Sequence, residues 1–178
     1  MTAAAHRRDL MSLDDWRALG EDPSQRYEVQ EGVLIVSPRP RQRHQNVMLA
    51  LGSRLLQQRP AGVRVTPEPD VIIDPRTPAT VRIPDLVICR GDEDATLTAA
   101  DVLIAIEVLS PGTRRVDLVM KRSEYADAGI EHYWIVDPDE RYMEVLTLID
   151  GAYVGRRVEG VFTTSVPFDV TIDLDDLG

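Results

Sequence analysis

The stretch Val102-Leu-Ile-Ala-Ile-Glu-Val-Leu109, followed by Ser110-Pro-Gly112, decides the fold. Seven of its first eight residues are apolar, which is typical of a strand that is covered on both faces of a sheet. The Pro-Gly pair ends the strand, and Thr113 can cap a helix that we expect to run to about residue 128 and to stop at Gly129. A strand, a tight turn and a helix in this order predict an α/β protein, because the helix can pack back across the sheet.

The segments on either side supply a second helix and further strands. Apolar residues recur at helical spacing in residues 43–58, which predicts a helix with His44 on its apolar face. The remaining expected strands lie at residues 27–36 (two strands that turn at Glu31-Gly32), 63–73, 83–89, 130–136, 142–149, 152–158 and 168–174. Together these elements predict a mixed β-sheet flanked by helices, with an additional C-terminal β-hairpin that turns at Asp150-Gly151.

Length and composition predict one globular domain behind a short N-terminal segment. The chain has 178 residues, of which 43% are hydrophobic, enough for a full core. We assign residues 1–26 to an N-terminal segment with a short helix capped by Ser12, and residues 27–178 to a single domain. No apolar run is long enough to span a membrane, no secretory signal is readable, and the single Cys89 fits a reducing compartment. We therefore expect a cytoplasmic protein without membrane association.

The excess of acidic residues argues against a protein that binds nucleic acid through a broad surface. The sequence has 20 Lys and Arg residues against 30 Asp and Glu residues, a net charge of −10. A basic surface usually supplies most of the affinity for nucleic acid. A local basic groove or a bound divalent cation can nevertheless reverse the field at one site.

Glu107 and Asp85 are the carboxylates least expected in a core. Glu107 interrupts the apolar strand, where a charge is costly unless it is paired or binds a cation. Asp85 begins the strand at residues 83–89, directly after Pro84. Two neighbouring strands that each carry a carboxylate near one end could hold a hard divalent cation. The alternatives are a Glu107 at the strand end that points to solvent or pairs with an arginine, and an Asp85 that is an ordinary strand-start or turn residue.

Lys121 is the only lysine among the 20 basic residues. The other basic residues are all arginine, which indicates a bias against lysine. A lysine that is kept despite this bias favours a site that needs a compact ammonium rather than a planar guanidinium. Chance survival of one lysine codon, or an exposed ion pair with Asp117 on the same helix face, are the alternatives. At an active site the ammonium could orient or activate water, or neutralise charge that develops on a phosphoryl group.

Further candidates rest on weaker patterns. Glu28 follows Tyr27 in a short strand and is either a further site carboxylate or an exposed residue, and His44 is either a site residue or a hydrogen-bonded core histidine. The candidates for phosphate contacts, with solvated helix arginines as the alternative, are Arg114, Arg115 and Arg122.

The order and spacing of several short motifs resemble the Uma-two family of the PD-(D/E)XK, restriction-endonuclease-like superfamily. The resemblance covers roughly residues 27–174. Its motifs are Tyr27-Glu-Val-Gln-Glu-Gly-Val-Leu34, Ser37-Pro38, His44-Gln45, Pro84-Asp85, Glu107-Val-Leu-Ser-Pro111, Asp117, Lys121, Tyr125, Ala128-Gly129, Tyr133-Trp134 and Val136-Asp-Pro138.

The resemblance implies a restriction-endonuclease-like core in which Asp85 and Glu107 bind Mg²⁺ or Mn²⁺. The implied reaction is metal-assisted hydrolysis of a phosphodiester, which we expect to be in DNA, with Lys121 stabilising or positioning the attacking species. The chain departs from the superfamily pattern at Leu109, where the signature has lysine, and Lys121 is the natural replacement. A homodimer is implied by analogy alone. We therefore expect an endonuclease, and the alternative is a nucleic-acid-associated regulatory module that keeps the fold without turnover.

Overall fold

The computed structural model describes residues 10–20, 25–37, 41–110 and 116–177, with the backbone alone at residues 116 and 117. The elements in chain order are α1 (Leu13–Ala18), β1 (Arg26–Gln30), β2 (Val33–Ser37), α2 (Gln42–Gln58), β3 (Arg64–Pro67), β4 (Val71–Asp74), β5 (Thr80–Arg82), β6 (Leu86–Cys89), β7 (Leu97–Thr98), the 3₁₀-helix η1 (Ala99–Asp101), β8 (Val102–Val108), the π-helix η2 (Val116–Met120), α3 (Lys121–Asp127), β9 (His132–Asp137), β10 (Tyr142–Ile149), β11 (Ala152–Glu159), β12 (Val161–Thr164) and β13 (Val170–Asp173).

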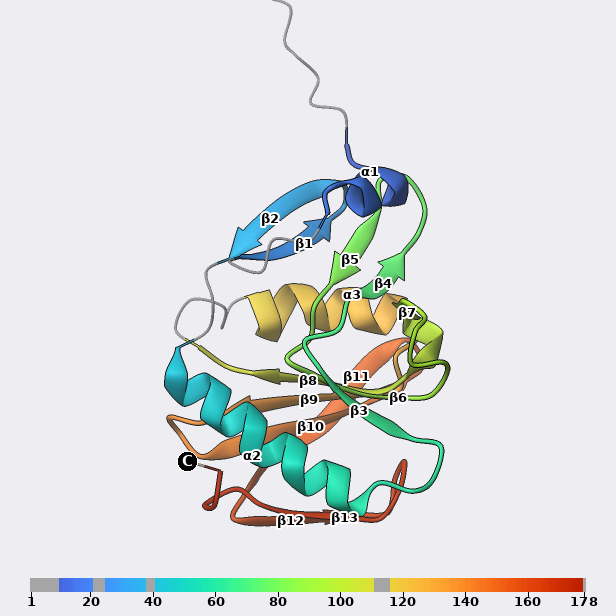
Figure 1. Cartoon of the computed structure of the whole chain (residues 1–178). Helices are drawn as coiled ribbons and strands as arrows, with labels where there is room; N and C mark the ends of the chain where they lie inside the picture. Colours follow the sequence, from blue (N-terminus) through green and yellow to red (C-terminus); the bar gives the residue numbers. More distant parts are fainter. Residues whose placement is uncertain (1–9, 21–24, 38–40, 111–115, 178) are drawn as a thin grey trace, which may run out of the picture.

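The main sheet has six strands in the order β11-β10-β9-β8-β6-β3. It is mixed, because β8 and β9 run parallel while the other neighbours run antiparallel. Helix α2 covers one side of this sheet and α3 lies on the other side (Figure 1). The fold is therefore the predicted mixed sheet flanked by helices, with the β10–β11 hairpin at its edge.

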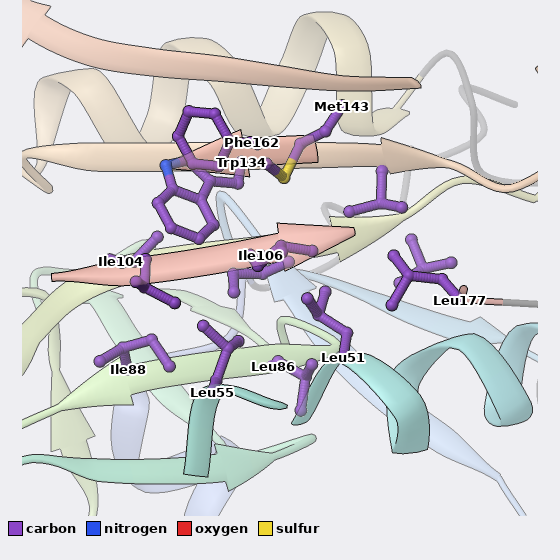
Figure 2. Packing of buried hydrophobic residues seen from close by; sticks show 14 of the residues in the cluster. Leu51, Leu55, Leu86, Ile88, Ile104, Ile106, Trp134, Met143, Phe162 and Leu177 are labelled. Carbon is purple, nitrogen blue, oxygen red and sulfur yellow. The ribbon is translucent and has the colours of Figure 1, made fainter. Parts of the chain in front are cut away.

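Alternation along β8 (Val102–Val108) divides the core into two parts. Ile104, Ile106 and Val108 belong to a cluster with the buried residues of α2, whereas Ala105 and Leu109 belong to a second cluster with Tyr125 of α3. The first cluster contains Trp134 and Phe162, whose rings meet edge to face at 5.6 Å (Figure 2). Glu107 has the parity of Ala105 and Leu109, so it points to the α3 side of the sheet.

A second, smaller sheet has the order β2-β1-β5-β4-β7. It was not predicted, because β5 and β7 have only three and two residues and show no periodicity of their own. Strand β12, which pairs with β13, was missed as well. Figure 1 shows the smaller sheet on the same side of the main sheet as α3.

Both predicted hairpin turns are present. Glu31 and Gly32 have φ angles of 46° and 77°, and Asp150 and Gly151 have 49° and 79°. Positive φ at both central residues is the type I′ geometry that matches the twist of two-residue hairpins. The predicted N-terminal helix is also found, and the Ser12 hydroxyl accepts the Asp15 N–H at its start.

Strand β6 begins at Leu86, three residues later than predicted. Pro84 has no N–H to donate to a neighbouring strand, so residues 83–85 form a link instead. This link carries the chain from β5 in the smaller sheet to β6 in the main sheet. Asp85 is thus at the junction of the two sheets. Among the described helices, none is long and apolar enough to cross a membrane.

Candidate active site

Asp85 and Glu107 come next to each other on adjacent strands. Strands β6 and β8 are antiparallel, and their pairing begins with Leu86 opposite Ile106, so the next residues along are Asp85 and Glu107. Each is only 2% exposed. Glu107 therefore does not point to solvent, and the structure places both predicted carboxylates in one buried region.

Asp85 is held by three donors. Its Oδ2 accepts the Val108 N–H at 2.7 Å and lies 3.0 Å from His44 Nε2, while its Oδ1 accepts a hydrogen bond of 3.0 Å from Arg26 Nη1. Burial alone would raise the pKa of Asp85, but the His44 hydrogen bond and the Arg26 charge outweigh burial and lower the pKa to about 2. Asp85 is therefore a carboxylate anion at neutral pH.

His44 reaches Asp85 from the first turn of α2. Burial lowers the pKa of His44, but the hydrogen bond to Asp85 and its negative charge raise the pKa above the ordinary value of 6.5. The other ring nitrogen, Nδ1, is buried and has no hydrogen-bond partner in the described ranges of the chain. His44 is therefore a buried histidine whose hydrogen bond goes to the predicted site residue Asp85.

Glu107 bonds to two side chains of α3. Lys121 Nζ donates a hydrogen bond of 2.8 Å and the Tyr125 hydroxyl one of 3.0 Å, both to Oε1. Residues four apart on a helix lie on one face, which explains how α3 presents both groups to the strand. Burial and, after it, the charge of Glu107 raise the pKa of Tyr125 well above 10, so the hydroxyl remains a donor. Lys121 is 3% exposed, which rules out a surface ion pair.

Glu28 is the third carboxylate of this region. Its Oε1 accepts the Ile83 N–H at 3.0 Å and lies 3.5 Å from Lys121 Nζ, and its Oε2 accepts a hydrogen bond of 3.2 Å from Arg82. Burial raises the pKa of Glu28, but the charges of Lys121, Arg26 and Arg82 together lower it below 4.5. The Lys121 ammonium thus lies between Glu28 of the smaller sheet and Glu107 of the main sheet.

Two arginines of the site were not predicted. Arg82 is fully buried and donates two hydrogen bonds of 2.7 Å to Glu124 in addition to its bond with Glu28. Arg26 contacts Asp85 and has Nη2 3.7 Å from Glu28 Oε1. The sequence held one hint for each residue. Arg26 lies two positions before Glu28 and so on the same strand face, and Arg82 lies between apolar residues just before Pro84.

Of the three predicted phosphate contacts, Arg122 is the one that the structure describes. Arg122 donates a hydrogen bond of 3.0 Å to the Tyr153 carbonyl of β11 and lies 3.8 Å from Glu144 of β10. Arg114 and Arg115 lie outside the described residues, as does the side chain of Asp117. Leu109, at the usual lysine position of the superfamily, is 4% exposed and belongs to the apolar cluster on the α3 side.

The chemistry of the donor set fits a hard divalent cation. Asp85 and Glu107 offer carboxylate oxygens from adjacent strands, and Mg²⁺ is commonly held by one or two carboxylates, with waters and substrate phosphate completing the shell. Within the described part of the chain, no group of three or more His, Cys, Asp or Glu side chains could hold a metal ion as it stands. A site here would therefore rely on the two carboxylates and on oxygens from outside the protein.

Comparisons with known proteins identify the family and the fold of the chain. A family model described as "Uma2: Putative restriction endonuclease" matches residues 12–175. No curated protein matches the chain. Among solved structures, the chain is similar to "a putative nuclease belonging to DUF820 from Anabaena variabilis", with a TM-score of 0.70, 18% identity, and coverage of 94% of this chain and 97% of the other. At this identity the likeness establishes the fold alone, whereas the family match spans nearly the whole sequence. The chain belongs to the Uma2 family.

Proposed function

We propose that the chain is a divalent-metal-dependent endonuclease that hydrolyses phosphodiester bonds in DNA. The observation that carries the proposal is the buried contact of two acids and one lysine: Asp85 and Glu107 on adjacent strands, and Lys121 at 2.8 Å from Glu107. A buried cluster of this kind is costly for stability, which favours a role in chemistry. The family description, a restriction endonuclease, supports the same reaction class.

In this proposal Asp85 and Glu107 hold Mg²⁺ or Mn²⁺. When bound, such an ion polarises a phosphoryl oxygen and lowers the pKa of a water molecule. Lys121 orients Glu107 and stabilises negative charge that develops on the phosphate, which a compact ammonium does well in a buried setting. Glu28 and Arg82 fix the position of that ammonium, and His44 and the Val108 N–H fix Asp85.

A second candidate is a nucleic-acid-associated regulatory module without turnover. It is favoured by one observation, the hydrogen bond between Arg26 and Asp85, because this bond neutralises a proposed metal ligand. We further propose a homodimer in the cytoplasm, which sedimentation of the purified chain and fractionation of cells can test.

Metal-dependent thermal unfolding tests the site without knowledge of the substrate. The protein is stripped with EDTA and heated with and without Mg²⁺ or Mn²⁺, since a ligand that binds only the folded state raises the melting temperature. We expect a rise in the native chain that is lost in Glu107→Gln but kept in Glu93→Gln, an equal charge change in an exposed loop. An equal response in all three proteins would indicate diffuse cation binding to an acidic surface and overturn the site.

Cleavage of supercoiled plasmid DNA then separates the two candidates. We expect Mg²⁺-dependent nicking by the native chain and its loss in Lys121→Ala, with the metal-induced rise in melting temperature largely kept. A native chain that shows the Glu107-dependent rise but cuts neither double- nor single-stranded DNA would favour the regulatory module.

A further inference from the structure

Arg26 and Arg82 enter the same carboxylate cluster but are bound very differently. Arg82 has no exposed side-chain surface, and all three guanidinium nitrogens donate to carboxylate oxygens of Glu124 and Glu28. Arg26 is 15% exposed and, within the described part of the chain, makes one hydrogen bond, from Nη1 to Asp85. Its Nε and Nη2 atoms are buried and have no hydrogen-bond partner among the residues that the structure describes. Arg82 is thus locked in place, whereas Arg26 is held at one point next to solvent.

The single bond of Arg26 falls on the oxygen of Asp85 that a cation needs. Oδ2 of Asp85 already receives the Val108 N–H and the His44 ring nitrogen, which together use its lone pairs. Oδ1 is the remaining oxygen, and within the described residues Arg26 is its hydrogen-bond donor. A divalent cation at Oδ1 would be repelled by the positive charge of Arg26 for as long as Arg26 is bound there.

Arg26 is surrounded by carboxylates. Besides Asp85, it lies 3.7 Å from Glu28 and 3.8 Å from Glu68. Its pKa is raised because the negative charges of Asp85, Glu107 and Glu28 outweigh the effect of burial. The guanidinium is therefore the counter-ion of the same acids that are proposed to hold the metal.

We propose that Arg26 is an internal competitor of the divalent cation, which must leave Asp85 Oδ1 before the cation can bind. The inference rests on the proposed metal site at Asp85 and Glu107. In the metal-free protein Arg26 offsets the repulsion among the acids, and on metal binding this role passes to the cation. The apparent association constant for the metal is then the intrinsic association constant multiplied by the fraction of molecules in which Arg26 has left Asp85.

Calorimetric titration of the EDTA-treated chain with Mn²⁺ tests this competition. We expect Arg26→Gln to bind Mn²⁺ at least roughly tenfold more tightly than the native chain, because the competing charge is gone. Arg26→Lys, which keeps a positive charge, should stay close to the native affinity. Arg76→Gln is the matched control, since it removes the same charge from an arginine that is 85% exposed.

The outcomes separate the failure of the inference from the failure of the site. Equal Mn²⁺ affinity in the native chain and Arg26→Gln, with binding lost in Glu107→Gln, would overturn the competition and leave the metal site standing. An equal gain in Arg26→Gln and Arg76→Gln would also overturn it, because a general change in charge would then explain the effect. No binding in any variant, Arg26→Gln included, would overturn the metal site and the inference with it.

A measurement on the native chain covers the case in which Arg26→Gln does not fold. The arginine Nε–H signals are followed by nuclear magnetic resonance during titration with diamagnetic Mg²⁺, with Arg26→Lys to assign the Arg26 signal. We expect the Arg26 signal to shift as the guanidinium leaves Asp85, while the Arg82 signal stays in place. An unchanged Arg26 signal at saturating Mg²⁺ would overturn the proposal.

Discussion

Lys121 donates a hydrogen bond of 2.8 Å to Glu107, although the two side chains come from a helix and a strand and are almost completely buried. Burying a single charge costs several kcal/mol, and a close partner offsets much of this cost (about 3–5 kcal/mol is lost when one partner is removed). The pair is therefore coupled: each residue lowers the cost of burying the other, beside the further contacts with Glu28 and Tyr125.

A double-mutant cycle measures this coupling. We expect Glu107→Gln and Lys121→Met each to lower the free energy of unfolding by about 3 kcal/mol, because each leaves a buried charge without its nearest partner. The double variant should lose clearly less than the sum of the two. The measurement is urea unfolding in EDTA. The exposed pair Arg157–Glu159, with a contact of 3.0 Å, is the control and should give a coupling close to zero. Additive losses at Glu107 and Lys121 would contradict the argument.

A lysine at position 109 should partly replace Lys121 in cleavage. Leu109 lies two residues after Glu107 and faces the same side of the sheet, so a lysine there can approach the same carboxylate. We expect Lys121→Leu to slow plasmid cleavage by about 100-fold or more, and the double variant Lys121→Leu with Leu109→Lys to regain about tenfold. Lys121→Leu with Leu109→Met controls for the change in packing. Equal rates in the two double variants would show that position 109 cannot supply the ammonium.

His44 should make stability depend on pH in a defined direction. Its pKa is raised in the folded state, chiefly by its hydrogen bond to Asp85 against the effect of burial. The stabilising contribution is thus complete below the unfolded pKa of about 6.5 and is lost as pH rises through the folded pKa. We expect the free energy of unfolding of metal-free protein to fall more steeply as the pH rises above about 6.5 in the native chain than in His44→Gln.

A second histidine, His132, also contributes to the pH dependence of stability. Its pKa is lowered by burial, so its contribution has the opposite sign and changes below pH 6.5. His132 is present in both proteins and cancels in their difference. Parallel pH profiles for the native chain and His44→Gln would mean that the Asp85 contact does not favour the protonated ring.

The parts of the fold that could be predicted are those with their own local pattern. The apolar run of β8, the helical spacing of α2 and the two hairpin turns each carry their signal within a few residues. The second sheet could not be predicted, because β5 pairs with β1 through a single register pair, Val29 with Val81. Such a contact is decided by tertiary packing and leaves no periodicity in the sequence.

The candidate site divides in the same way. Asp85, Glu107 and Lys121 stood out because a charge within an apolar run, or a lone lysine, is anomalous in the sequence itself. Arg26 and Arg82 did not stand out, since arginine is the common basic residue of this chain. Both arginines and Glu28 belong to the smaller sheet. They contact the acidic side chains of the site only because the smaller sheet packs next to the main sheet, which the sequence does not reveal.

Tyr125 should act on Glu107 in a way that a comparable tyrosine does not. The Tyr125 hydroxyl donates a hydrogen bond of 3.0 Å to Glu107, and the Tyr153 hydroxyl donates one of 2.7 Å to the Ile130 carbonyl. Both are buried, so Tyr125→Phe and Tyr153→Phe should each cost about 1–2 kcal/mol of unfolding free energy. Only Tyr125→Phe should change Mn²⁺ affinity and the rate of plasmid cleavage, because only this hydroxyl orients a proposed metal ligand. Loss of cleavage in both variants in proportion to their stability would assign Tyr125 to packing alone.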